Sequence, residues 1–324
     1  MHDKILEVKN VKKYFPVKAG AFRQPLQLKA VDDVSFDMYK GETIGLVGES
    51  GCGKSTLGRT IVRLYEPTAG EIIFKGRNIS KLKRSELKPL RKEMQLIFQD
   101  PYSSLNPRMN VNSIVGEALL AHNLVEKGQD YEDRVIQIIE KCGLASYHVN
   151  RYPHQFSGGQ RQRIGIARAL ALNPEFMVAD EPVSALDVSI QSQILNLMND
   201  LKHEMGLSYL FISHDLSVVK HISDRIGVMY LGSLIELTDK EILYRRPLHP
   251  YTQALIAAIP EADPKKRKTM EAIKGEIPSN VNVPTGCKFH TRCPYVKDIC
   301  KEIVPEFREI EKNHLVACHF AGEI

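Results

Sequence analysis

The sequence predicts an α/β fold with a largely parallel sheet as its core, a helical subdomain and a small cysteine-bearing segment near the C-terminal end. A strand-like stretch at 42–47 leads into a glycine-rich loop and then a helix, and residues 174–240 alternate between strand and helix patterns. Such alternation is typical of βαβ units joined into a parallel sheet. Residues from about 100 to 172 have helical patterns instead, which places the helical subdomain between two parts of the sheet.

Four short segments predict strands, at 5–8, 42–47, 176–181 and 209–212, of which 42–47 and 176–181 are expected to be buried. Each is too short for a helix of ordinary length, and the runs at 42–47 and 209–212 are followed by residues that favour a turn.

The predicted helices have recognisable ends. Residues 131–142 repeat apolar side chains at helical spacing, and the helix at 157–172 begins with Ser as N-cap and stops before Asn-Pro. A helix over 189–205 ends at Gly206, a residue favoured after a helix because it tolerates a left-handed conformation. An apolar helix is also expected at 253–259, before a charge-dense stretch that includes 261–268.

The most specific signal is the segment 48–56, GESGCGKST, which matches the phosphate-binding pattern G-x-x-x-x-G-K-[ST]. Glycines let the backbone curl around anionic oxygens, and the following helix start favours negative charge. Lys54 supplies positive charge to the terminal phosphates, and the Ser55 hydroxyl can ligate Mg²⁺. The residues expected to contact the nucleotide here are Gly48, Ser50, Gly51, Cys52, Gly53, Lys54, Ser55 and Thr56.

A pair of carboxylates follows the predicted strand at 176–181. Asp180 is expected to hold Mg²⁺ through its hydration shell, and Glu181 is expected to polarise an attacking water. A strand that ends in Asp-Glu is by itself weak evidence for a catalytic pair, and the evidence is stronger here because the chain also has a phosphate loop.

A second glycine-containing helix start lies at Ser157-Gly158-Gly159-Gln160. A helix start without bulky side chains is a further place where an anion can bind. One chain with two such starts needs an explanation beyond a single bound phosphate group.

These motifs together resemble the ATPase subunits of ABC transporters. Ser157 to Gln160 resembles the signature motif of that family, Gln99 its Q-loop glutamine, 184–187 its D-loop and His214 its switch histidine. The resemblance implies a P-loop ABC-type ATPase fold with a mixed or parallel sheet core. It also implies an ATPase domain over 1–240, with a helical subdomain at about 100–172, and a C-terminal extension over 241–324.

The resemblance also implies the roles of individual residues. Two ATPase subunits would associate head to tail, so that Ser157, Gly159 and Gln160 act on the nucleotide held by the partner's phosphate loop. Gln99 would contact Mg²⁺, Glu181 would act as the general base, and His214 would stabilise charge on the terminal phosphate. Asp187 in the D-loop is expected at the nucleotide site as well, and either Phe15, favoured by register, or Tyr14 would stack on adenine.

Composition limits the remaining possibilities. The chain has 324 residues and a formal net charge of +5. No apolar run approaches the length of about 20 residues that spans a bilayer, and no signal peptide is recognisable. We therefore expect a cytosolic protein that reaches the membrane through its partners, and no run of basic and aromatic residues predicts binding to nucleic acid.

Four of the six cysteines lie close together, with the spacing C-x5-C-x6-C-x17-C at Cys287, Cys293, Cys300 and Cys318. Structural disulfides are rare in the cytosol, so a metal site that stabilises a short tail is the better explanation. Zinc fits four thiolates but usually has C-x2-C pairs. An iron–sulfur cluster spreads its ligands over several irons and so tolerates longer loops.

The tail resembles the C-terminal extension of the dipeptide and oligopeptide importer branch, through 249–252, 282–287 and 289–294. This resemblance implies a 4Fe–4S cluster on the four cysteines, with zinc as the alternative. It also implies ATP-driven uptake of short peptides through two transmembrane permease subunits that receive peptide from an extracellular binding protein. A nickel importer, or an ABC-type ATPase not coupled to transport, would share the core motifs. We expect ATP binding by residues 1–240 to be independent of the cysteine tail.

Overall fold

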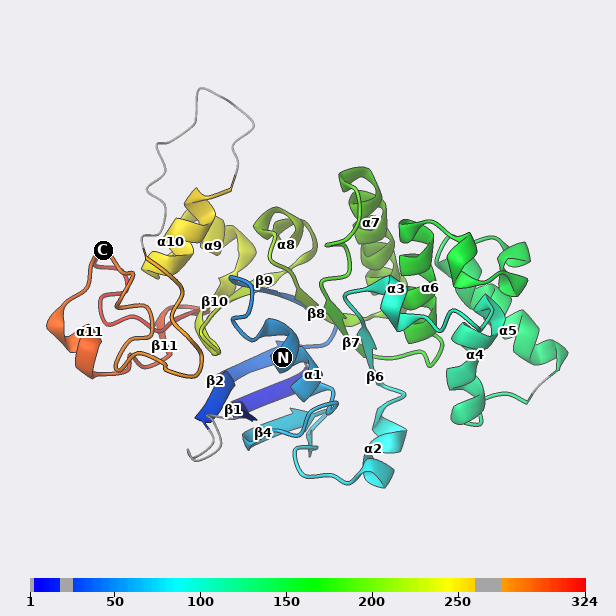
Figure 1. Ribbon diagram of the computed structural model, residues 1–324, viewed down its shortest axis with the longest axis horizontal. Helices are drawn as coiled ribbons and strands as arrows, with labels where there is room; N and C mark the ends of the chain where they lie inside the picture. Colours follow the sequence, from blue (N-terminus) through cyan, green and yellow to red (C-terminus); the bar gives the residue numbers. More distant parts are fainter. Residues whose placement is uncertain (1–2, 18–25, 127, 260–274) are drawn as a thin grey trace. The chain divides into compact units, whose positions relative to one another are not determined.

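The computed structural model describes residues 3–17, 26–126, 128–259 and 275–324 (Figure 1). The chain divides into two compact units that interleave along the sequence. The described residues of 4–38, 43–81 and 212–324 form what we call the phosphate-loop unit, and those of 3, 39–42 and 82–211 form the signature unit. Each unit is described by itself.

The phosphate-loop unit contains an antiparallel sheet with the strand order β2-β1-β4-β5. In it β1 pairs with β4, with Leu6 opposite Phe74 and Val8 opposite Ile72. Near the start of β1, Ile5, Leu6 and Val8 are buried and Glu7 is half-buried, so this part of the strand packs against the core. The strands are β1 (Lys4–Val17), β2 (Leu26–Tyr39), β4 (Ala69–Phe74) and β5 (Arg77–Asn78).

The same unit holds one part of a mixed sheet, in the order β11-β12-β10-β9-β3. The pair β3 and β9 is parallel, whereas β9, β10, β12 and β11 pair antiparallel in turn. The chain's last strand, β12, therefore pairs with β10, and the tail adds to the sheet. The bounds are β3 (Thr43–Val47), β9 (Arg225–Tyr230), β10 (Ser233–Asp239), β11 (Arg308–Glu311) and β12 (His314–Val316).

Short helices complete this unit. The helix α8 packs on β3, where Gly45 leaves room for Val219. The helices are α1 (Lys54–Ile61), α8 (Leu216–Ile222), α9 (Lys240–Arg245), α10 (Pro250–Ala257) and α11 (Asp298–Glu302).

In the signature unit, β6 (Met94–Ile97) pairs parallel with β7 (Phe176–Asp180), and β8 (Ser208–Ile212) neighbours β7. Every residue of β7 and β8 is buried, as expected for central strands of a parallel sheet. The helix α6 (Gly158–Leu170) contacts β6.

Further helices of this unit contact α6 (Figure 1), namely α3 (Pro101–Ser104), α4 (Val111–Ala121), α5 (Gln129–Lys141) and α7 (Val188–Met205). The helix α2 (Arg84–Leu90) precedes β6 and lies apart from this group, and 3-10 turns lie at Ser146–Asn150 and Pro153–Gln155.

Several predicted boundaries are confirmed. The helix from Ser157 runs to Leu170, and α7 ends at Gly206, whose φ of 67° is left-handed. The predicted helix at 253–259 is wrong at both ends, because α10 runs from Pro250 to Ala257, and the His249 side chain accepts from the Tyr251 N–H at its start. The histidine caps the helix in place of a Ser or Asp. The charge-dense stretch at 261–268 lies outside the described residues.

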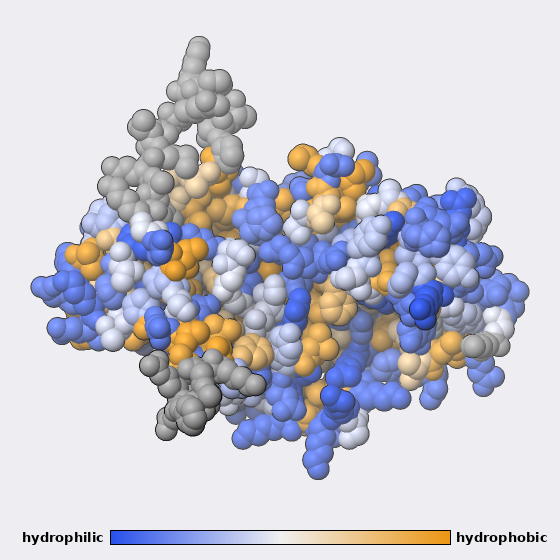
Figure 2. Space-filling view, viewed as in Figure 1, coloured by the Kyte–Doolittle hydropathy of each residue, from blue (hydrophilic) through white to orange (hydrophobic). Residues whose placement is uncertain are grey.

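Among the described residues, no helix is both long and apolar enough to cross a bilayer. Figure 2 shows a face on which hydrophilic residues predominate and apolar residues form separate patches.

Candidate functional site

The phosphate loop connects β3 to α1 within the phosphate-loop unit. All five residues of β3 are buried, which fixes where the loop begins. Gly53 stands at the N-cap of α1 with a φ of 105°, and no side chain caps this helix start. The first N–H groups of a helix have no partner within the helix, so an uncapped start favours an anion.

Glycine is required at both ends of the loop. A Cβ at Gly48 would clash with the carbonyl oxygen of Met229 in β9, and a Cβ at Gly53 would clash with that of Ala30 in β2. Both residues also have positive φ. The loop is therefore pressed against two strands by close backbone contacts that no other residue type allows.

Lys54 lies inside the loop and is 5% exposed. Its Nζ donates to the carbonyl oxygens of Gly48 at 2.7 Å and of Glu49 at 3.1 Å. The ammonium group is thus held at the loop, where a terminal phosphate would be bound. Cys52 is buried, and burial raises the pKa of its thiol, so any contact of this residue with a nucleotide would come from its backbone.

The carboxylates and the Q-loop glutamine meet in the signature unit. Asp180 is fully buried at the end of β7, and Glu181 follows it with a positive φ of 47°. This left-handed conformation ends the strand directly after Asp180 and turns the chain at Glu181. The Gln99 side chain donates to Glu181 Oε2 at 2.9 Å, so two residues 82 positions apart in the sequence are in contact.

The second helix start is capped by its own side chains. Ser157 Oγ accepts from the Gln160 N–H at 3.3 Å, and the Ser157 N–H donates to the Gln160 side chain at 3.1 Å. This reciprocal arrangement is a capping box. A Cβ at Gly159 would clash with Ile190 of α7, so this glycine allows the helix start to approach α7 closely.

His214 and Asp187 are both exposed. His214 directly follows Ser213, whose N–H donates to the Leu46 carbonyl at 3.1 Å. Asp187 is the N-cap residue of α7 but makes no capping bond with its side chain. Both side chains are placed at element ends, the usual location of residues that act on a ligand.

The two candidate adenine-stacking rings lie side by side in β1 with different contacts. The Tyr14 hydroxyl donates to Asp32, and burial together with this bond raises the pKa of Tyr14. Phe15 contacts the ring of Tyr65 edge-on at 5.5 Å, and Lys13 lies 4.8 Å from its centroid.

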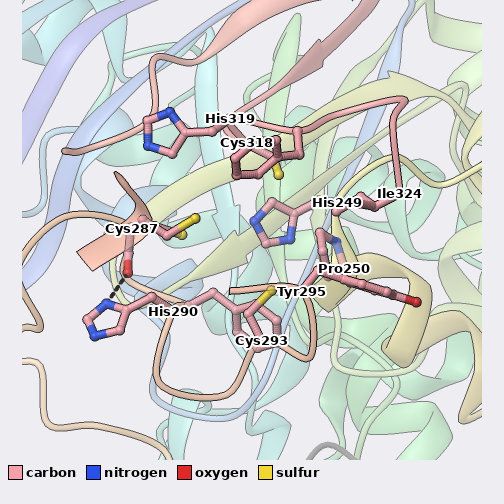
Figure 3. Close-up of a pocket in the computed structure, with 12 residues that line it drawn as sticks. His249, Pro250, Cys287, His290, Cys293, Tyr295, Cys318, His319 and Ile324 are labelled. Carbon is pink, nitrogen blue, oxygen red and sulfur yellow. Dashed lines mark hydrogen bonds between the residues drawn. The ribbon is translucent and has the colours of Figure 1, made fainter. Parts of the chain in front are cut away.

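The four tail cysteines line a single small cavity, although they come from positions up to 31 residues apart in the sequence (Figure 3). The sulfur atoms of Cys287, Cys293 and Cys318 point toward the same space in Figure 3, and Cys300 completes the set from α11. All four are free thiols. The sequence-based grouping of these residues therefore has a geometric counterpart.

The pKa values of three of the tail thiols differ from those of exposed cysteines. Burial, with a contribution from the neighbouring cysteines, raises the pKa of Cys287 to about 12 and also raises the pKa values of Cys293 and Cys318. A metal would have to displace their protons. The cavity of about 20 Å³ is close to the size of one water, and within the described residues no group of three or more ligands is close enough to hold a single ion.

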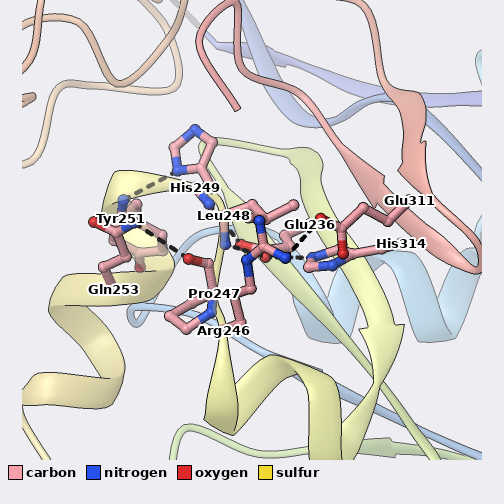
Figure 4. A network of polar contacts seen from close by, with 9 residues as sticks. All are labelled: Glu236, Arg246, Pro247, Leu248, His249, Tyr251, Gln253, Glu311 and His314. Carbon is pink, nitrogen blue, oxygen red and sulfur yellow. Dashed lines mark hydrogen bonds and ion pairs between the residues drawn. The ribbon is translucent and has the colours of Figure 1, made fainter. Parts of the chain in front are cut away.

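A buried polar network that was not predicted from the sequence attaches the tail to β10 (Figure 4). Glu236 is fully buried and accepts from the N–H groups of Leu248 at 2.7 Å and His249 at 3.0 Å. His314 Nε2 lies 2.7 Å from Glu236 Oε1. The single signal in the sequence is a glutamate inside the otherwise apolar run 234–237, an unusual place for a charge.

Comparison with known proteins agrees with these observations. Two families match the chain: "ABC transporter" over residues 31–184 and "Oligopeptide/dipeptide transporter, C-terminal region" over residues 235–300. Among solved structures, the dimeric ATP-binding cassette MJ0796 bound to ADP and Pi has a TM-score of 0.65 and 29% identity, covering 72% of this chain and 98% of that one.

Two curated relatives match almost the full length. The oligopeptide transport ATP-binding protein AppF of Bacillus subtilis is 57% identical, and the match covers 97% of each chain. The oligopeptide transport ATP-binding protein OppF of the same organism is 52% identical over 98% of this chain and 97% of its own. The chain belongs to the family of ABC transporter ATP-binding proteins, in its oligopeptide/dipeptide branch.

Proposed function

We propose that this ABC transporter ATPase hydrolyses ATP to drive the import of dipeptides and oligopeptides. The observation that carries the hydrolytic part is the contact between Gln99 and Glu181, which places a glutamine and a candidate base together beside buried Asp180. The match of its tail to the oligopeptide/dipeptide C-terminal region carries the substrate class.

We assign the chemical roles as follows. The phosphate loop and Lys54 bind the triphosphate, and Glu181 takes a proton from the attacking water while Gln99 orients its carboxylate. Ser55, Gln99 and Asp180 are the residues that would hold Mg²⁺, an ion that neutralises charge on the phosphates. His214 would donate to the terminal phosphate as charge develops there.

The two helix starts fit a head-to-tail dimer. Residues 48–56 would bind one nucleotide, while Ser157, Gly159, Gln160 and Asp187 would act on the nucleotide of the partner subunit. Ser157 fits this role because a hydroxyl that accepts one bond from Gln160 keeps its proton to donate to a phosphate oxygen. ATP would then close the dimer, and hydrolysis would release it.

The transport assembly follows from this assignment. Two permease subunits would span the membrane, with this subunit at its cytoplasmic face and an extracellular protein delivering peptide. In domain terms, residues 1–240 would form the ATPase, with the helical subdomain at about 100–172, and residues 241–324 would form the extension.

We propose that Cys287, Cys293, Cys300 and Cys318 hold a 4Fe–4S cluster. Four thiols that line one cavity have the donor chemistry for it, and their sequence spacing, which lacks C-x2-C pairs, favours several irons over one zinc ion. Because the cavity has room for about one water, the surrounding loops would have to open for the cluster to enter.

The transport assignment is tested with this subunit assembled with its permeases and binding protein in liposomes. Peptides of two to five residues should stimulate ATP hydrolysis and accumulate inside the vesicles. Stimulation by nickel without any effect of peptide would assign the chain to nickel import. ATP hydrolysis that is indifferent to the permeases would mean an ATPase not coupled to transport.

A further inference from the structure

The phosphate loop is held from outside its own motif at Glu49. The Glu49 N–H donates to Tyr251 Oη at 3.0 Å, and its carbonyl oxygen accepts from Lys54. Its carboxylate accepts from both terminal nitrogens of Arg292, at 2.9 and 3.1 Å. The backbone and the side chain of one loop residue are thus fixed by partners more than 200 positions away in the sequence.

The ion pair between Arg292 and Glu49 has the features of a strong one. It is bidentate, and the Arg292 side chain is only 5% exposed while that of Glu49 is 23% exposed. The Arg292 guanidinium, like that of other arginines, is charged at any ordinary pH. A bidentate pair fixes orientation as well as distance, which a lysine in the same place would not do.

A buried aromatic cluster positions Arg292 and Tyr251. The rings of Tyr230, Tyr251 and Phe289 pack with centroids 4.7 to 5.4 Å apart, and all three side chains are almost fully buried. Tyr230 ends β9 beside the loop, Tyr251 lies in α10, and Phe289 belongs to the segment between the first two tail cysteines. A third tail residue reaches the loop, because Asn280 Nδ2 donates to the Gly51 carbonyl at 2.9 Å.

Lys288 of the same tail segment makes a second set of contacts, near the candidate adenine-stacking residue Tyr14. Lys288 Nζ donates to Asp32 Oδ2 at 2.9 Å, to the Leu231 carbonyl at 3.0 Å and to Ser233 Oγ at 2.7 Å. Asp32 also accepts from the Tyr14 hydroxyl. The tail therefore contacts the phosphate loop and, through one carboxylate, a candidate adenine-stacking residue.

We propose that Arg292 is a positioning residue for ATP, which acts by holding Glu49 and thereby the shape of the phosphate loop. It has a second, electrostatic effect. Without Arg292 the Glu49 carboxylate would carry an unbalanced negative charge next to the bound triphosphate and repel it. The proposal rests on the assignment of residues 48–56 as the ATP site.

The test is the dissociation constant of a fluorescent ATP analogue for the full chain, purified without oxygen. R292A should raise this constant about tenfold, the loss expected for a charge-assisted bidentate contact. R292K should lie between R292A and the wild type. Adding E49Q to R292A should recover part of the affinity, because it removes the unbalanced charge.

Two controls make the result specific. R246A removes an arginine that pairs with Glu311 at 2.9 Å in the same tail, away from the loop, and should leave ATP affinity unchanged. K54A tests the site itself: if it does not weaken binding, the assigned ATP site is wrong, whatever R292A does. If K54A weakens binding while R292A stays within twofold of the wild type, the positioning role is overturned.

A purely structural role predicts a different pattern. It would lower the thermal midpoint and the active fraction, and so kcat, with KM for ATP unchanged. The positioning role predicts a higher KM with kcat largely kept at saturating ATP. If R292A does not fold, R292K carries the test, since lysine keeps the positive charge but cannot make the bidentate contact with the Glu49 carboxylate. We expect about threefold weaker binding for R292K, and no weakening would overturn the proposal.

Discussion

The two glycine-containing helix starts of this molecule are held in opposite ways. At α6 the cap is local, because Ser157 and Gln160 bond each other reciprocally within four residues. At α1 no side chain caps the helix, and the preceding loop is fixed by Tyr251, Asn280 and Arg292 of the tail. The residues of the motif itself therefore fix the geometry of the α6 start, whereas the loop before α1 also depends on residues far away in the sequence.

This difference bears on one expectation. We expected ATP binding to be independent of the cysteine tail because the phosphate loop and Asp180 lie outside the tail. The loop is nevertheless in contact with the tail, because Arg292 and Asn280 contact Glu49 and Gly51 directly. Since Arg292 is adjacent to Cys293, anything that disorders the cysteine segment is expected to reach the loop.

The largest effect is expected in the signature unit. E181Q should lower ATP turnover more than about 100-fold, because glutamine cannot act as a base. The amide can still accept from Gln99, so the local structure should persist. ATP affinity should stay within twofold of the wild type, unlike that of R292A. Turnover assays and nucleotide titration check this pair of results, and turnover near the wild-type rate would mean that another group is the base.

A bulky residue at the signature helix start should separate assembly from binding. In S157F the monomer should bind ATP normally, while dimer formation and hydrolysis are lost. Q137F places a side chain of the same size on an exposed position of α5 and should leave both dimer formation and hydrolysis unchanged. Sedimentation and nucleotide titration check this. A failure of the S157F monomer to bind ATP would count against action on the partner's nucleotide.

Cysteine substitution should connect the tail to the loop. The protein purified without oxygen should be brown, and C293S should lose the colour because thiolate-to-iron charge transfer is lost. Its ATP dissociation constant should rise several-fold, since the residue next to Arg292 is no longer fixed. Absorption spectra, metal analysis and nucleotide titration check these effects. If the protein contains stoichiometric zinc and neither iron nor sulfide, the four cysteines bind zinc and the cluster assignment is wrong.

Acid should loosen the tail before the rest of the chain. Burial lowers the pKa of His249 to about 4, and its ordinary value is 6.5. The unfolded state therefore binds the proton more readily, so stability is present above about pH 6.5 and is lost as the pH falls toward 4. At pH 5 the free energy of unfolding is expected to be about 2 kcal/mol lower than above pH 6.5 because of this residue. H249N keeps a capping acceptor and should remove most of this dependence in unfolding titrations, and an unchanged dependence would assign it to other groups.

Local signals predicted much of this structure. The loop at 48–56, the cap at Ser157 and the end of α7 at Gly206 each depend on a few neighbouring residues, and the structure has them where expected. The contact between Gln99 and Glu181 could be anticipated only from family resemblance, because parallel strands bring together residues distant in sequence.

The tail could not be predicted in the same way. The pairing of β12 with β10 and the bonds from Arg292 to Glu49 join segments far apart in sequence, and no local pattern encodes such a pairing. Buried Glu236 was a visible anomaly, yet its partners Leu248, His249 and His314 carry no shared motif.

Amide hydrogen exchange compares the two helix starts most directly. It is measured on the full-length protein, as wild type and as R292A, without nucleotide. We predict faster exchange in peptides covering 48–56 of R292A, and unchanged exchange in peptides covering 157–163. Equal exchange in the phosphate loop of the two proteins, or an equal rise at both helix starts, would contradict the claim that the tail specifically holds the phosphate loop.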